Sequence, residues 1–358
     1  MTPTDPARDR HTLALWLLIV AAMIFAMVVL GGATRLTRSG LSIVEWRLVA
    51  GTLPPLSDVH WLELFDKYRL TPEYRKINVG MDLAGFKEIF WLEYLHRLWG
   101  RLIFLVALVP LVWFLWRKRI EKRLVPHMVA VPLLVAANGV LGWFMVASGL
   151  VDIPRVSPYR LTAHLGLAIG LYGYVLWLAL GLLYPAQGKL EWTLLRRGAT
   201  AVTALVFFMI LTGGFVAGTK AGYTFNTFPL MNGRFVPEGI FGMEPWWVNL
   251  FENVATVQFN HRLVAYLLLL AIPGYWLYAR RFDLSARARW LLHGLLAVLG
   301  IQVLLGIATL LYIVPVPLGA AHQAGALVLF TFALASHHAL RAELSNKRIE
   351  LPPQQMQR

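Results

Sequence analysis

Long apolar stretches alternate with shorter polar segments along the whole chain. Eight of these stretches have the roughly twenty apolar residues that a helix needs to cross a bilayer core. They span residues 13–32, 97–116, 126–147, 160–183, 198–217, 259–278, 289–312 and 317–339. The stretch at 13–32 has no Ala-x-Ala cleavage site after it, which favours a retained helix over a signal peptide. The pattern therefore predicts an all-α membrane protein with eight transmembrane helices.

Two of the polar segments are much longer than the others. Segment 33–96 has mixed charge, and we expect residues 58–69 within it to form a short amphipathic helix with Ser57 as its N-cap. Segment 218–258 is rich in aromatic residues. This composition predicts that it lies against the membrane surface and covers a cavity.

The basic residues indicate how the helices are oriented in the membrane. Loops 117–125, 184–197 and 279–288 are rich in Lys and Arg, whereas the opposite short loops hold only Arg155. The positive-inside rule makes the basic side cytoplasmic, and an even number of helices puts both termini there. We therefore expect a multi-pass protein of the bacterial cytoplasmic (inner) membrane.

The chain repeats itself in two halves. The matched segments are Gly31-Gly32 with Gly213-Gly214, Thr37-Arg38-Ser39-Gly40 with Thr219-Lys220-Ala221-Gly222, His96-Arg97-Leu98 with His261-Arg262-Leu263, Asn138 and Gly142 with Gln302 and Gly306, and Ala163-His164 with Ala321-His322. Each half holds four predicted helices, so the two repeats have the same orientation. We predict two four-helix bundles, residues 1–190 and 191–358, related by a pseudo-two-fold axis along the membrane normal.

Composition narrows the possible functions. The 358 residues are 58% hydrophobic with a mean hydropathy of +0.60, which is too apolar for a soluble domain of this length. The formal charge of +14 first suggests nucleic acid, but Lys and Arg lie mostly in short loops between apolar runs, so no nucleic-acid partner is expected. The lack of cysteine excludes disulfides, thiolate nucleophiles and iron–sulfur clusters.

Four of the ten histidines occupy matched positions in the two halves. His96 and His164 belong to the first half, and His261 and His322 to the second. Each lies near the start of a helix that runs inward, so all four are expected toward the outer face. Two imidazoles that face each other across a four-helix bundle suit the two axial positions of a heme iron. The alternative is a polar residue capping a helix end, but the repeat favours ligands.

The surroundings of these four histidines distinguish them from the others near helix ends. Small neighbours would let a flat macrocycle approach the helices: Gly100, Ala163, Gly166, Ala321 and Gly325. The histidines at the cytoplasmic helix ends are instead expected to be interfacial: His127, His293, His337 and His338.

The halves differ three residues before the first histidine of each pair. Glu93 precedes His96, whereas Gln258 precedes His261. If the helix extends back to Glu93, the i,i+3 spacing puts its carboxylate on the histidine face. There it could move protons or stabilise a developing positive charge. The alternative is an outer-surface acid paired with Arg97 or Arg101. The amide in the second half favours a function, with one half for chemistry and the other for a redox cofactor.

Four cations at matched positions lie near the predicted sites. Arg97 and Arg262 each follow a histidine, and Arg38 and Lys220 each follow the first helix of a half. They could pair with the propionates of bound hemes. The alternative is that they extend to lipid phosphates.

The quoted motifs resemble the heme A synthase family, in the branch shared by mitochondria and many proteobacteria. The resemblance runs from about Leu30 to His338. Its most specific segments are Gly-Gly-Ala-Thr-Arg-Leu-Thr-Arg-Ser-Gly-Leu-Ser at 31–42, Gly-Thr-Leu-Pro-Pro-Leu at 51–56, Glu93-x-x-His96-Arg97, Asn-Thr-Phe-Pro-Leu-Met at 226–231 and Asn260-His261-Arg262.

The resemblance implies an enzyme that oxidises the position-8 methyl of heme O to a formyl group by successive hydroxylations, giving heme A for terminal oxidases. It implies that His261 and His322 bind a b-type heme and that His96 and His164 are the substrate-side histidines. Glu93 matches the family's essential acid. The expected partners are the lipid bilayer, an upstream farnesylating synthase that supplies heme O, an unidentified electron donor and a second copy of the chain.

Two other functions compete with this interpretation. A di-heme electron-transfer protein would explain the four histidines equally well, but not why an acid occurs in one half only. A transporter would explain the internal repeat, but not the histidine pattern.

Overall fold

A computed structural model describes residues 6–46, 50–150, 154–185 and 193–346 of the chain. Eight helices in these ranges are long and apolar enough to cross a membrane, which confirms the predicted number. They are α1 (Pro6–Leu36), α4 (Leu83–Trp116), α5 (Val125–Ala147), α6 (Pro158–Leu183), α7 (Leu194–Thr219), α8 (Val254–Ala279), α9 (Ala286–Leu311) and α10 (Val316–Asn346). The described residues form no strand beyond one isolated β-bridge between Met231 and Arg234. The protein is therefore an all-α, multi-pass membrane protein.

The segment between α1 and α4 departs from its predicted boundaries. Helix α4 begins at Leu83, where Asp82 caps it by accepting a hydrogen bond from the Gly85 N–H. It therefore extends well beyond the predicted span at 97–116, and the expected outer segment 33–96 ends at residue 82. The added turns bury aromatic residues against protein instead of lipid, so a search for continuous apolar residues does not detect them.

Short helices build the polar segments at this end of the molecule. The amphipathic helix expected at 58–69 is confirmed as α2 (Asp58–Arg69), with the Ser57 side chain accepting from the His60 N–H. Helix α3 (Pro72–Lys76) follows α2 in the chain, and the 3-10 helix η1 (Ala50–Thr52) precedes α2. The second polar segment holds η2 (Ala221–Tyr223) and η3 (Trp246–Leu250). An aromatic cluster fixes α2 to α4: Trp61, Phe65, Tyr68, Phe86, Phe90 and Tyr94.

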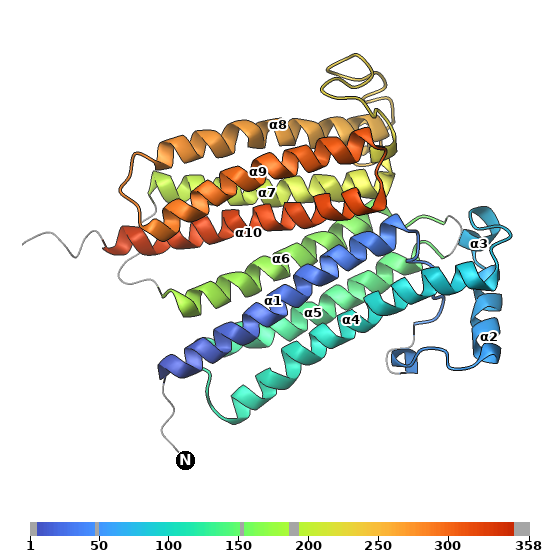
Figure 1. Ribbon diagram of the computed structural model, residues 1–358, viewed down its shortest axis with the longest axis horizontal. Helices are drawn as coiled ribbons and strands as arrows, with labels where there is room; N and C mark the ends of the chain where they lie inside the picture. Colours follow the sequence, from blue (N-terminus) through green and yellow to red (C-terminus); the bar gives the residue numbers. More distant parts are fainter. Residues whose placement is uncertain (1–5, 47–49, 151–153, 186–192, 347–358) are drawn as a thin grey trace, which may run out of the picture.

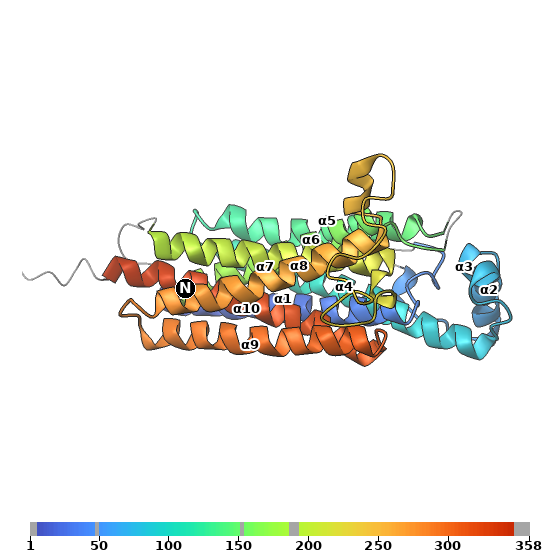
Figure 2. The ribbon, with the colours of Figure 1, turned by 90° about the horizontal axis from the view of Figure 1, so that it is seen from above.

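The eight long helices pack in two groups with matching contacts. In the first group, α1 and α5 each pack against α4 and α6. In the second, α7 and α9 each pack against α8 and α10. The groups meet where α6 contacts α7 and where α10 contacts α1 and α6 (Figures 1 and 2). Residues of all eight helices share one hydrophobic core.

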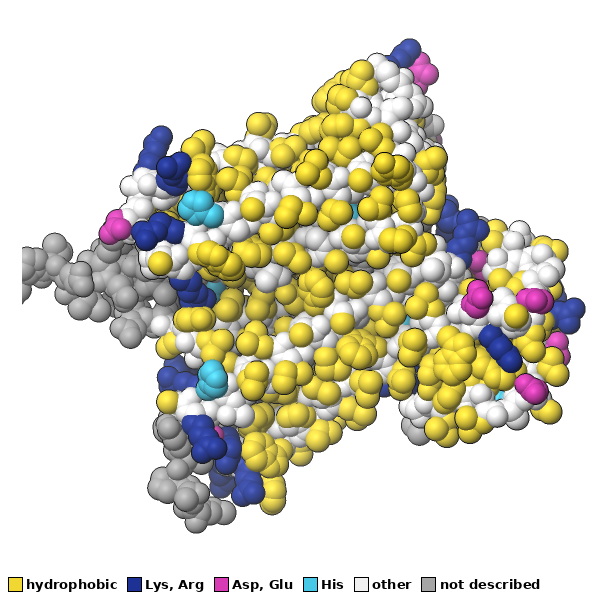
Figure 3. All heavy atoms as spheres, viewed as in Figure 1, with side chains coloured by type: hydrophobic (Ala, Val, Ile, Leu, Met, Phe, Trp, Pro, Cys, Tyr) yellow, Lys and Arg dark blue, Asp and Glu magenta, His cyan; other side chains and the backbone are white. Residues whose placement is uncertain are grey.

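The outer surface of the helices is also apolar. Figure 3 shows hydrophobic side chains over the middle of the molecule, with Lys and Arg gathered toward its two ends. This distribution is typical of helices that face lipid along their length and polar headgroups at their ends.

Candidate functional site

The four matched histidines lie on four different helices, each against a glycine of a neighbouring helix. All four rings are half-buried. A Cβ added to the facing glycine would lie 2.9 to 3.3 Å from the Cε1 atom of the ring, so any larger residue would require the ring to shift. The pairs are His96 on α4 with Gly31 on α1, His164 on α6 with Gly142 on α5, His261 on α8 with Gly213 on α7, and His322 on α10 with Gly306 on α9.

These glycines differ from the small residues expected beside the histidines. Of the glycines in that prediction, Gly100 faces Met27, Gly166 faces Leu211 and Gly325 faces Gln302. The predicted small residues lie on the same helix as each histidine. The close approach instead comes from the adjacent helix, which the repeat of Gly-Gly and of Gly142 could have indicated.

In the second half, side chains hold the Nδ1 atom of each imidazole. Thr212 Oγ1 lies 2.8 Å from His261 Nδ1 and donates its own proton to the Met209 carbonyl. Since a hydroxyl has one proton, Thr212 accepts from the Nδ1–H of His261, which leaves Nε2 free to bind a metal. The amide of Gln302 lies 3.2 Å from His322 Nδ1 and donates to the His322 carbonyl at 2.9 Å.

The first half has no such side-chain contacts. The Nδ1 atoms of His96 and His164 are buried, and no side chain of the described residues hydrogen-bonds to either. The repeat position of Thr212 holds Leu30, which has no hydroxyl. The counterpart of Gln302 is the shorter Asn138, whose Oδ1 is buried without a partner. The two histidine pairs are therefore chemically different despite their matched positions.

The Nε2 atoms are the ring nitrogens available to a ligand. In His261, for example, Thr212 contacts Nδ1 and leaves Nε2 uncontacted. His96 interacts electrostatically with His164, and His261 with His322, so each half brings its own two imidazoles together. Two imidazoles in each half, each lying against a glycine, suit the binding of a heme iron.

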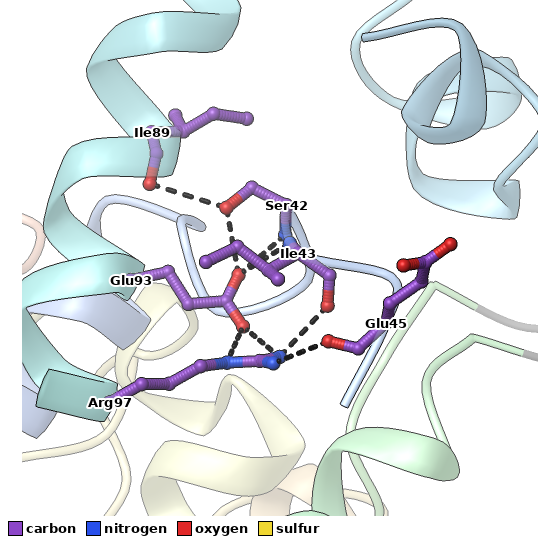
Figure 4. A network of polar contacts seen from close by, with 6 residues as sticks. All are labelled: Ser42, Ile43, Glu45, Ile89, Glu93 and Arg97. Carbon is purple, nitrogen blue, oxygen red and sulfur yellow. Dashed lines mark hydrogen bonds and ion pairs between the residues drawn. The ribbon is translucent and has the colours of Figure 1, made fainter. Parts of the chain in front are cut away.

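Glu93 is buried at the centre of a hydrogen-bond network (Figure 4). Its Oε2 accepts from the Ser42 N–H at 2.8 Å, the Ser42 hydroxyl at 2.7 Å and the Ile43 N–H at 2.9 Å. Its Oε1 accepts from Arg97 Nε at 2.9 Å and also pairs with Nη2. Helix α4 does extend back to Glu93, as the i,i+3 argument required. The acid pairs with Arg97 but is not at the outer surface.

Arg97 also binds the backbone that follows α1. Its guanidinium donates to the carbonyl oxygens of Ile43, at 2.8 Å, and Glu45, at 3.0 Å. In the second half Arg262 donates to Phe225 and Thr227, which are the matched carbonyls. Both arginines therefore anchor the segment that follows the first helix of their half to the histidine helix, and their pairing with propionates stays a prediction.

The amide of Gln258 occupies the place of Glu93 but reverses the hydrogen bonding. Its Nε2 donates to the carbonyl oxygens of Ala221 and Thr224 at 2.8 and 2.6 Å. Thr224 is the repeat counterpart of Ser42, whose N–H group donates to Glu93. The amide can thus hold the segment without a negative charge.

Arg38 and Lys220 come together from the two halves. Each follows its helix in a left-handed conformation, with φ of 58° and 60°. Desolvation and the nearby Arg38 lower the pKa of Lys220. Burial raises the pKa of Glu73 on α3, although Arg38 and Lys220 oppose that shift. These electrostatic interactions place both cations near each other and near Glu73 of α3.

The histidines expected at the interface have different surroundings. His127 Nδ1 lies 2.8 Å from the Tyr174 hydroxyl, and His293 Nδ1 lies 2.6 Å from the Arg289 carbonyl; both side chains are exposed. His338 is completely buried, with its ring against Trp177 of α6, so helices of both halves enclose it.

Comparison with known proteins identifies the family. Residues 14–334 match the COX15-CtaA family, described as cytochrome oxidase assembly protein. A protein of Nitrosospira multiformis named "Heme A synthase" is 52% identical over 92% of this chain and 94% of its own length. A protein of Parvibaculum lavamentivorans with the same name is 49% identical over 93% of this chain and 95% of its own length. "Heme A synthase COX15" of Arabidopsis thaliana is 44% identical over 94% of this chain and 76% of its own length. The chain therefore belongs to the COX15-CtaA family of cytochrome oxidase assembly proteins.

Proposed function

We propose that this protein is an oxidoreductase that converts heme O to heme A by oxidising the position-8 methyl to a formyl group. The observation that carries the proposal is the difference between the halves. Each half brings two imidazoles together, but only the first has a buried carboxylate three residues from one of them. The names of the relatives support this activity.

The second half is the proposed site of a resident b-type heme. His261 and His322 would hold its iron, and the heme would supply an iron that carries electrons one at a time. Thr212 holds His261 with Nε2 free, and Gln302 restrains His322. Side-chain contacts of this kind orient metal ligands and strengthen their binding. They suit a cofactor that remains bound.

The first half is the proposed substrate site. His96 and His164 would bind the iron of heme O without a side chain that holds Nδ1. Weaker restraint of the ligands suits a heme that must enter as substrate and leave as product. Glycine at Gly31 and Gly142 leaves room for the rings to turn toward the macrocycle.

Glu93 would stabilise positive charge that develops near the reacting methyl. Both carboxylate oxygens accept hydrogen bonds, two of them from rigid backbone N–H groups. Such fixed groups cost no reorganisation during the reaction. The network favours a stationary counter-charge over a proton carrier, which would have to exchange its partners.

The remaining parts of the proposal concern the propionates and the membrane. Arg38 and Lys220 are the better propionate partners, because Arg97 and Arg262 already bind loop carbonyls.

Both termini would be cytoplasmic and the histidines would lie toward the outer face. The two halves, 1–190 and 191–358, would be pseudo-symmetric. Heme O would come from the farnesylating synthase, and electrons from an unidentified donor.

Extraction of the hemes from the purified protein tests the proposal. Chromatography and mass spectrometry should find heme b together with heme O, a hydroxylated heme or heme A. Heme b alone would support the alternative, a di-heme electron-transfer protein. A protein without heme would contradict both.

A further inference from the structure

A cavity lies at the end of the bundle opposite α2 and α3. It has a volume of about 420 Å³ and opens between α1, α5 and α6 of the first half and α10 of the second. We call it the basal cavity. Its lining combines charged groups with apolar ones: Arg10, Arg123 and Arg341, and Leu124, Met128, Leu178 and Leu182.

Among the described residues, Arg341 is the cation of this cavity without an acidic partner. Arg10 and Arg123 both pair with Glu121, at 2.8 Å. Arg341 forms no ion pair or hydrogen bond within the same part of the chain, and its Nε is buried without a partner. Its guanidinium carbon lies 5.3 Å from the ring centre of Trp177, which also lines the cavity. The positive charge is thus held at the wall of the cavity by an aromatic ring and not by an acid.

His338 provides a second, independent sign of a polar ligand. It lies one helical turn before Arg341, is fully buried, and neither ring nitrogen has a hydrogen-bond partner within the described residues. Its ring centre is 5.0 Å from that of Trp177, and its Nε2 would lie 4.0 Å from a Cβ added at Gly181; Trp177 and Gly181 both line the cavity. A buried polar group without a partner is costly, so its position beside Arg341 indicates that a polar group binds at this wall.

We propose that the basal cavity binds an anionic phospholipid. Arg341 would bind its phosphate, and the apolar wall of Leu124, Met128, Leu178 and Leu182 would receive the start of an acyl chain. The cavity lies where α6 ends, at Leu183, and where α5 begins, at Val125. The ends of membrane-spanning helices typically meet the lipid headgroups. Basic pockets between helices at this depth are typical of sites for anionic lipids.

The site joins the two halves of the molecule. The cation stands on α10, whereas most of the wall belongs to α1, α5 and α6. A lipid bound to both groups would therefore stabilise their association. This inference does not depend on the proposed oxidation of heme O.

Native mass spectrometry and thermal unfolding of the delipidated full-length protein in detergent test the site. Phosphatidylglycerol should bind and raise the unfolding temperature, and phosphatidylcholine should not. Arg341→Gln should weaken phosphatidylglycerol binding about fivefold, the effect of one cation near a membrane surface. The matched control is Arg280→Gln, because Arg280 also lies over a tryptophan, Trp276, but outside the cavity.

Two further measurements separate a lipid site from a general effect of charge or of phosphate. Leu178→Trp fills the apolar side of the cavity without changing its charge, and it should also reduce phosphatidylglycerol binding. This variant still tests the site if Arg341→Gln fails to fold. Inorganic phosphate at the same concentration should not raise the unfolding temperature. Equal binding of both lipids, an undiminished affinity in both cavity variants, or stabilisation by phosphate alone would overturn the proposal.

Discussion

At the scale of single residues, one amide in place of a carboxylate separates the two halves. Glu93 accepts hydrogen bonds from Ser42 and Ile43, whereas Gln258 donates to Ala221 and Thr224. Both side chains hold the segment that follows the first helix of their half. Only Glu93 also brings negative charge, so its role in holding the segment can be separated from its role in chemistry.

Replacement Glu93→Gln tests this separation. The amide oxygen can still accept from the backbone N–H groups of Ser42 and Ile43, so the protein should fold and retain heme b. The formation of heme A should fall by about a hundredfold or more, as when a preorganised electrostatic group is removed. Chromatography of extracted hemes measures both quantities. Glu238→Gln, an exposed acid paired with Arg234, is the control and should leave both unchanged. Normal heme A yield from Glu93→Gln would exclude a role for the charge.

Thr212 is predicted to tune the ligand His261. Thr212→Val removes the oxygen that accepts from Nδ1 and keeps the shape of the side chain. Loss of such a contact typically weakens metal-site affinity by about 10- to 100-fold, so the purified variant should retain less heme b. The visible spectrum measures the heme per protein. Thr203→Val on the same helix, whose hydroxyl binds only backbone carbonyls, should retain the wild-type amount. Equal heme in both variants would argue against the role of Thr212.

At the scale of helices, glycine on one helix sets the place of histidine on the next. The Gly-Gly repeat has two uses. Gly31 and Gly213 face the histidines of their own half. Gly32 and Gly214 face Gln323 and Thr162 of the other half. The two adjacent glycines on each of α1 and α7 thus let that helix lie close both to a histidine of its own half and to a helix of the other half.

Gly306→Ala tests the close approach at His322. The new Cβ would lie 2.9 Å from Cε1 of the ring, so the imidazole must move. We expect the variant to fold but to bind less heme b. Gly300→Ala on the same helix is the matched control, because nothing lies within 4 Å of its new Cβ. Heme content relative to protein distinguishes the two, and an unchanged content in Gly306→Ala would refute the steric argument.

The sequence predicted the parts of this structure that depend on local pattern. Apolar length gave the eight helices, and Ser57 gave the start of α2. The beginning of α4 was missed because its first turns are covered by aromatic residues of α2, which hydropathy cannot anticipate. The repeat identified four histidines, but the partners of their Nδ1 atoms depend on how neighbouring helices are rotated.

At the scale of the whole molecule, two groups of helices make matching internal contacts but are chemically unequal. The groups are tied by polar contacts, such as the Gln323 amide donating to the Val28 carbonyl at 2.7 Å. Within this common frame the second half holds its imidazoles by side chains, and the first half adds a charged acid. The central claim is that one half keeps a heme and the other changes one.

The heme content of two double variants tests this claim most directly. His96→Ala with His164→Ala should retain heme b and lack heme O, hydroxylated intermediates and heme A. His261→Ala with His322→Ala should lose heme b and accumulate unconverted heme O. Mass spectrometry of the extracted hemes, per mole of folded protein, gives both results. Loss of heme b from the first variant, or its retention in the second, would contradict the division of roles between the two halves.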